Sequence, residues 1–103
     1  MKKVEYTPNA ANKLRQLNQY ITLYYGNKKA KEVTTKITKA IRELINNEQM
    51  GPSVKEMFGI PLNYRYIFVA KNYVFYSIEQ DKIHIINIYH EKEDFINHLF
   101  DGS

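Results

Sequence analysis

The chain has 103 residues, of which 44% are hydrophobic and 25% charged, and this composition predicts one compact globular domain over residues 1–103. Its formal net charge of +4 favours an acidic partner, such as nucleic acid, an acidic protein or an anionic surface. The absence of cysteine excludes disulfides and thiolate metal sites and is typical of a reducing cytoplasm. No stretch is long and apolar enough to cross a bilayer, so we expect a cytoplasmic protein with no membrane partner.

The N-terminal region has the pattern of a short strand followed by a helix. We expect the strand over residues 3–7, after which Thr7 and Pro8 are typical of a helix N-cap and a first helical position. Apolar residues continue at helical spacing to Tyr24. Gly26 suits the left-handed residue that ends such a helix.

A second amphipathic helix is predicted after Gly26, with an apolar stripe from Ala30 to Leu44. The opposite face is basic and is expected to be an outer face in solvent or, as the alternative, a nucleic-acid contact; its residues are Lys28, Lys31, Lys39 and Arg42. Because the connection between the helices is short, they should form an antiparallel hairpin.

The second half of the chain has the pattern of strands. Residues 54–58 are expected to form a short strand, and residues 64–70, 73–79 and 82–89 three longer ones. The gaps between the longer strands are too short for parallel crossovers. Residues 92–100 have the spacing of a short amphipathic helix. The predicted fold class is therefore α+β, with an N-terminal two-helix hairpin packed on a curved antiparallel β-sheet meander and a short C-terminal helix.

Two side chains in the predicted sheet carry the most chemical information. Arg65 lies within an aromatic, apolar run and shares a strand face with Ile67 and Val69. His90 follows the last strand, and alternation places it on the same face as His84, Ile86 and Ile88. A buried guanidinium needs a partner, and a histidine can exchange a proton near neutral pH. We therefore expect Arg65 and His90 to meet over one groove that can grip a polyanion.

An ordered set of residues runs through nearly the whole chain. The set comprises Tyr6-Thr7-Pro8, Leu14, Leu17, Tyr20-Ile21, Tyr25-Gly26, Ala30, Ile41, Leu44 and Gly51, then Tyr64-Arg65, Tyr73-Val74-Phe75-Tyr76, Ile83 to Ile88 and Tyr89-His90. This set resembles the RelE/ParE superfamily of bacterial toxins from type II toxin–antitoxin pairs. The resemblance implies a helical hairpin on a curved sheet and a cognate antitoxin that wraps the toxin. It also implies one of two activities, cleavage of messenger RNA on the ribosome or inhibition of DNA gyrase.

The resemblance also implies roles for particular residues in the nuclease branch. Arg65 matches the arginine that contacts the scissile phosphate, and a planar guanidinium suits that role. His90 matches the residue that transfers protons, and Glu56 is the candidate for an assisting carboxylate. The candidate RNA-binding residues are Lys55, Tyr89 and Tyr64.

A structural role is the alternative for Arg65 and for His90. Arg65 could pair with Glu56, Glu79 or Asp94, and His90 with Glu91 or Asp94. The acidic run after His90 would repel a phosphate chain, which favours the ParE-like branch. His84 is expected to pack in the sheet and His98 to be exposed.

The first functional hypothesis is a growth-inhibiting endoribonuclease, or mRNA interferase, that acts on the ribosome. The alternative is a ParE-like gyrase inhibitor without nuclease activity, whose helices and C-terminal segment would carry the effect. A third possibility is an inactive adaptor that binds its antitoxin. No cofactor or small-molecule substrate is expected, because the three histidines have no zinc spacing and the four glycines form no phosphate-binding loop.

Overall fold

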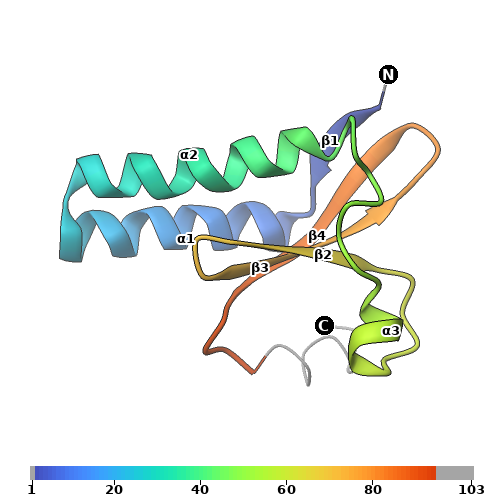
Figure 1. Cartoon of the computed structure of the whole chain (residues 1–103). Coiled ribbons are helices and arrows are strands. Elements are labelled where there is room, and N and C mark those ends of the chain that lie inside the picture. The colour runs from blue at the N-terminus through green and yellow to red at the C-terminus, as the bar shows by residue number, and fades with distance from the viewer. Residues whose placement is uncertain (1, 95–103) are drawn as a thin grey trace.

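The computed structural model describes residues 2–94, in which two helices pack against one face of a four-stranded sheet (Figure 1). The elements in chain order are β1 (Lys3–Tyr6), α1 (Pro8–Tyr25), α2 (Asn27–Glu43), α3 (Val54–Phe58), β2 (Arg65–Val69), β3 (Asn72–Ile78) and β4 (Lys82–His90). This confirms the predicted α+β class. The expected C-terminal helix over residues 92–100 falls largely on residues 95–100, which lie outside the described residues. No helix within residues 2–94 has the length and apolar character needed to span a membrane.

Local sequence signals set the limits of the helical hairpin. The Thr7 hydroxyl accepts a hydrogen bond of 3.0 Å from the Ala10 amide, and Pro8 occupies the first helical turn. Gly26 ends α1 with φ of 92°, a left-handed value that a glycine adopts without strain. Because α2 starts at the next residue, the two helices lie side by side as predicted (Figure 1).

The sheet has the strand order β1-β4-β3-β2. The meander of β2, β3 and β4 is antiparallel, as predicted. β1 pairs with β4 in parallel, with Val4 opposite Ile83, so the sheet as a whole is mixed. A parallel pair is possible here because α1 and all later elements lie between β1 and β4 in the chain, which is enough for a crossover.

The prediction of a strand over residues 54–58 is wrong, because this segment is the helix α3. The Ser53 hydroxyl accepts a hydrogen bond from the Glu56 amide and caps the helix, and Gly59 ends it in the left-handed conformation with φ of 69°. Val54 and Phe58, four residues apart, lie on one side of α3 and pack into a cluster on the sheet face opposite the hairpin.

The predicted alternation along the last strand is also wrong beyond Ile85. Ile85 pairs with Tyr76 and Asn87 with Phe75, so Ile86 is an extra residue that has no opposite partner. Ile83, Ile85 and Ile88 therefore all pack against the hairpin, whereas Ile86 packs on the other face. This bulge turns the end of β4, including His90, toward the hairpin side.

The core lies on both faces of the sheet. Between the sheet and the hairpin, the main cluster contains Ala10, Ile37, Ile41, Leu44, Ile67, Val74, Tyr76, Ile83, Ile85 and Ile88. On the opposite face, a more aromatic cluster contains Val54, Ile60, Phe75 and Tyr89. Burial of these apolar side chains on both faces is the main force that holds the sheet in place.

Candidate functional site

Arg65 lies at the corner of the sheet where the segment between α2 and α3 crosses β2. Its guanidinium donates a hydrogen bond of 2.6 Å to the Gly51 carbonyl oxygen. Ser53 forms an isolated antiparallel bridge with Arg65, and the Tyr66 amide donates to the Pro52 carbonyl at 3.2 Å. The half-buried guanidinium therefore helps to attach residues 51–53 to the edge of the sheet.

Tyr76 completes this corner from within the core. Its side chain is fully buried, and its hydroxyl accepts from the Gly51 amide at 3.1 Å and donates to the Glu48 carbonyl at 2.7 Å. Burial raises the pKa of the Tyr76 phenol, and the hydrogen bond from Gly51 partly offsets this. A Cβ atom at Gly51 would lie 2.0 Å from the Tyr66 carbonyl oxygen, so only glycine fits. The corner is a tightly connected structural joint.

The residues expected to assist Arg65 lie close to this corner or on the opposite face of the sheet. Glu56 and Lys55 are exposed on α3, which begins beside Arg65 because Ser53 pairs with that residue. Tyr64 directly precedes β2; its carbonyl accepts from the Val54 amide at 2.9 Å, and its side chain packs against the aromatic cluster. The structure thus places Arg65 and Glu56 in one region.

His90 is the last residue of β4 and lies at the other end of the sheet. Its Nδ1 accepts a hydrogen bond of 3.2 Å from the Lys92 amide, so a neutral ring carries its proton on Nε2. The backbone amide of His90 donates to a Glu93 carboxylate oxygen at 3.0 Å, and the other oxygen of that carboxylate lies 2.6 Å from the Lys13 ammonium. These contacts attach the end of β4 to α1.

The electrostatics of this attachment follow from its contacts. Partial burial acts to raise the pKa of Glu93, but the hydrogen bonds from Lys13 and from the His90 amide outweigh it, and the pKa is lowered. Tyr89 is only 2% exposed, with the Lys13 ammonium 5.0 Å from its ring centroid. Its ring therefore lies inside the molecule rather than on a surface.

The two groups expected to act together are far apart. Arg65 pairs with Tyr76 and His90 with Asn72, so they are four residues apart along β3 and lie on the strands either side of it. At the usual spacings along and between strands, their Cα atoms are about 16 Å apart. Arg65 is not among the residues that line the groove beside His90. The catalytic roles of Arg65, His90 and Glu56 stay a prediction.

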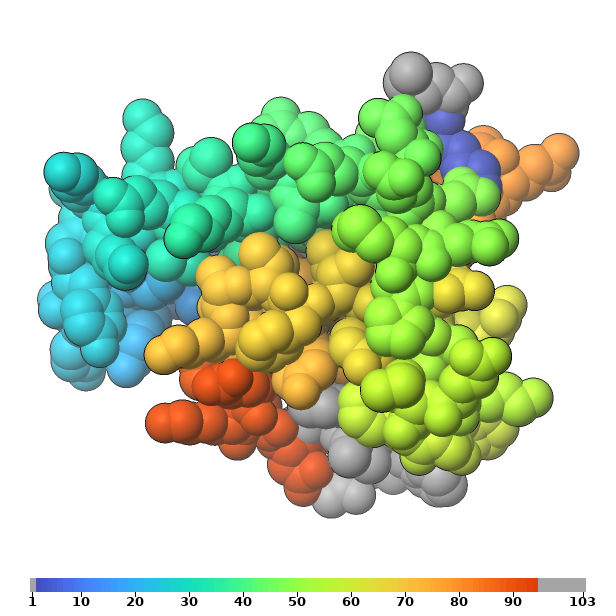
Figure 2. All heavy atoms as spheres, in the orientation of Figure 1, coloured from blue at the N-terminus to red at the C-terminus, as the bar shows by residue number. Residues whose placement is uncertain are grey.

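A groove of about 790 Å³ opens beside His90, between the hairpin, the turn joining β2 to β3 and the segment after β4. Figure 2 shows the same three parts of the surface, with the segment after β4 in red below the turn. Its floor contains Leu17, Ile21 and Val33. Its walls carry Tyr20, Tyr25, Lys29, Lys36, Lys71, His90 and Lys92. Among the described residues that line it, none carries a carboxylate. We call this surface the basic groove.

The basic groove was not predicted from the sequence. The predicted basic face of α2 contains Lys28, Lys31 and Lys39, whereas Lys29 and Lys36 are seven residues apart and share another face of that helix. That spacing could have placed both lysines on one face of α2. Lys71 and Lys92 join them through tertiary structure, which no local pattern reveals.

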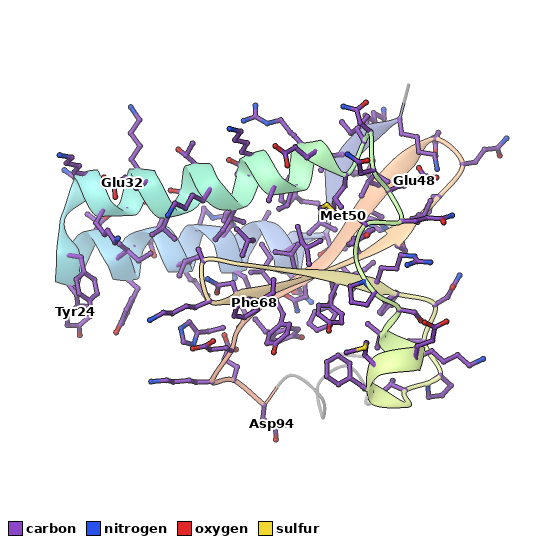
Figure 3. All side chains as sticks on the ribbon, in the orientation of Figure 1. Tyr24, Glu32, Glu48, Met50, Phe68 and Asp94 are labelled. Atoms are coloured by element: carbon purple, nitrogen blue, oxygen red, sulfur yellow. The ribbon has the colours of Figure 1, made fainter. Side chains whose placement is uncertain are left out.

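The tip of the hairpin exposes a second surface, which is apolar. Leu23 is 77% exposed and Tyr24 is 64% exposed, and Figure 3 labels the Tyr24 side chain at this tip. The Tyr20 and Tyr24 rings pack with centroids 4.8 Å apart. We call Leu23 and Tyr24 the tip patch. Adjacent large apolar side chains left in solvent are typical of an interaction surface.

Comparison with known proteins assigns this fold to a class of toxins. Residues 4–95 match the family described as "ParE toxin of type II toxin-antitoxin system, parDE". The chain therefore belongs to the ParE toxin family and is a toxin of a type II toxin–antitoxin system.

A solved structure described as "Chromosomal ParDE TA system from P. aeruginosa" has a TM-score of 0.72 to this chain. The match covers 87% of this chain and 96% of that one at 19% sequence identity, which shows a shared fold. No curated protein matches the chain in sequence.

Proposed function

We propose that this toxin stops growth by binding DNA gyrase and not by cutting messenger RNA. The observation that carries the proposal is the separation of about 16 Å between Arg65 and His90 along and across the sheet. Membership of the ParE family supports the same choice, because the ParE branch of the superfamily is the gyrase-inhibiting one.

The chemistry of RNA scission explains why this separation matters. A group that moves a proton must come within about 3 Å of the atom concerned, and a phosphate-binding group must hold the same phosphate. With their Cα atoms about 16 Å apart, Arg65 and His90 could reach one phosphate only if both side chains extended toward each other across β3. Arg65 already donates to the Gly51 carbonyl, which gives it a structural role without an RNA ligand.

The tip patch is the part of the surface that we assign to gyrase. Leu23 and Tyr24 project from the end of the helical hairpin, away from both core clusters. Their apolar surface would be buried on binding, which supplies a driving force without any catalytic group. In the cell, a cognate antitoxin would bind the toxin in the cytoplasm and prevent this contact.

A supercoiling reaction with purified gyrase and relaxed plasmid tests the proposal. The full-length toxin should inhibit supercoiling and accumulate linear DNA. The double variant Leu23→Ser, Tyr24→Ser should lose most of this inhibition. The matched control is Met57→Ser, which removes a similarly exposed apolar side chain on α3, at 57% exposure, and should inhibit as the natural toxin does. Full gyrase activity at saturating toxin would contradict the proposal.

Cleavage of messenger RNA is the second candidate, and one observation favours it. His90 lines a groove rich in lysine, where an RNA strand could be held. In this case Glu56→Ala, His90→Ala and Arg65→Ala should each reduce toxicity while the variants stay folded. Glu56→Ala is the sharpest of the three, because Glu56 is exposed and its loss should leave a gyrase inhibitor fully toxic.

A further inference from the structure

Four lysine side chains line the basic groove, and none of its described lining residues carries a carboxylate. Its lysines come from three places: Lys29 and Lys36 from α2, Lys71 from the turn between β2 and β3, and Lys92 from the segment after β4. Lys29 lies 4.0 Å from Glu32, but both are exposed, so the pair is weak and leaves the charge largely available. The positive charge is therefore concentrated on one concave surface.

The inner surface of the basic groove has a different character. Tyr20 is 56% exposed and Tyr25 is 66% exposed, and both line the groove above its apolar floor. A single nucleic-acid strand has the complementary chemistry, because each base has an apolar face that stacks on aromatic rings and each phosphate carries a charge. A duplex hides its base faces and would use only the lysines.

The turn that carries Lys71 supports a role in binding. Ala70 and Lys71 have φ of 50° and 64°, left-handed values that residues other than glycine and asparagine rarely adopt. The Glu91 amide donates to the Lys71 carbonyl at 2.9 Å and ties the turn to the end of β4. A strained and anchored turn thus holds this lysine at the edge of the groove.

We propose that the basic groove binds single-stranded nucleic acid, with phosphates on its lysines and bases stacked on Tyr20 and Tyr25. The inference goes beyond gyrase binding, because it assigns a separate ligand to a separate surface. A toxin with both surfaces would hold gyrase through the tip patch and an exposed DNA strand through the groove. The distribution of the lysines over three elements fits successive phosphates of one strand passing between the hairpin and the sheet.

Fluorescence anisotropy with the purified full-length chain and a labelled mixed-sequence oligodeoxynucleotide tests this proposal. The single strand should bind more tightly than the corresponding duplex. For about four lysine contacts, the logarithm of the binding constant should fall with the logarithm of salt concentration at a slope of about −3. The double variant Lys36→Glu, Lys71→Glu should weaken binding at least tenfold.

Two matched controls separate the groove from general charge and aromatic content. Lys28→Glu, Lys39→Glu changes the net charge equally at exposed positions that do not line the groove, and should weaken binding far less. Tyr25→Ala should weaken binding about tenfold through lost stacking. Phe68→Ala, which removes a ring that is 50% exposed and does not line the groove, should leave binding unchanged. Circular dichroism of each variant confirms that it is folded.

Three outcomes would overturn the proposal. The first is no binding of the single strand at low salt, and the second is equal loss in the two lysine pairs. The third is binding of a glutamate-rich peptide in the groove with no binding of the oligonucleotide, which would assign the groove to an acidic protein. The assay contains no gyrase, so its failure leaves the gyrase proposal standing, and uninhibited supercoiling leaves this one standing.

Discussion

Replacement of Arg65 by alanine distinguishes a structural guanidinium from a catalytic one. The variant loses the hydrogen bond of 2.6 Å to the Gly51 carbonyl. The carbonyl oxygen then lacks this partner at a half-buried position. A hydrogen bond from a charged group contributes about 1.5–3 kcal/mol, so we expect the free energy of unfolding to fall by about 2 kcal/mol. In a chain of this size, that corresponds to a decrease in Tm of roughly 10 °C.

Thermal unfolding followed by circular dichroism measures this effect. The matched control is Arg15→Ala, because Arg15 is exposed on α1 and its guanidinium contacts Asn12 of the same helix. The control should change stability by less than about 0.5 kcal/mol. Below its melting temperature, Arg65→Ala should still inhibit gyrase. A variant with unchanged Tm that has lost all toxicity would refute the structural role and point to contact between Arg65 and a target.

The remaining predictions concern the two ends of the sheet. Gly51→Ala should destabilise the fold by more than about 3 kcal/mol, since its Cβ would lie 2.0 Å from the Tyr66 carbonyl oxygen; an unchanged denaturant midpoint would contradict this. Because the pKa of Glu93 is lowered in the folded state, its bond to Lys13 stabilises the fold above pH 4.5, the ordinary pKa of glutamate, and this stability is lost as pH falls. The variant Glu93→Gln should therefore show a smaller loss of stability at acid pH. The raised pKa of Tyr76 has the opposite effect on stability: as pH rises above 10.0, the phenol ionises first in the unfolded chain, so the free energy of unfolding falls. The variant Tyr76→Phe should therefore show a shallower fall in stability at alkaline pH. At neutral pH it should be about 1–3 kcal/mol less stable, because the two hydrogen bonds of the hydroxyl are lost.

Elements with strong local signals could be predicted from the sequence. Thr7, Pro8 and Gly26 set the limits of α1 through hydrogen bonds and backbone angles within a few residues. The helix α3 could not be separated from a strand by periodicity, since it has five residues. Its caps, Ser53 and Gly59, were the usable signal.

The positions of the candidate site residues depended on tertiary structure. Simple alternation placed His90 and Ile86 on one face, but the bulge at Ile86 moves them to opposite sides of the sheet. The register between β2, β3 and β4 then sets the distance from Arg65 to His90, and simple alternation does not reveal the bulge that shifts this register. For the same reason, the meeting of Lys71 with Lys36 in the basic groove was not predicted.

A reconstituted translation reaction without gyrase tests most directly whether this toxin binds a target or cuts RNA. The full-length chain is added to purified ribosomes that translate a defined message, and both the protein product and the 5′ ends of the message are measured. We predict undiminished translation and an intact message at toxin concentrations that stop purified gyrase. New 5′ ends within the message, together with loss of the product, would contradict it.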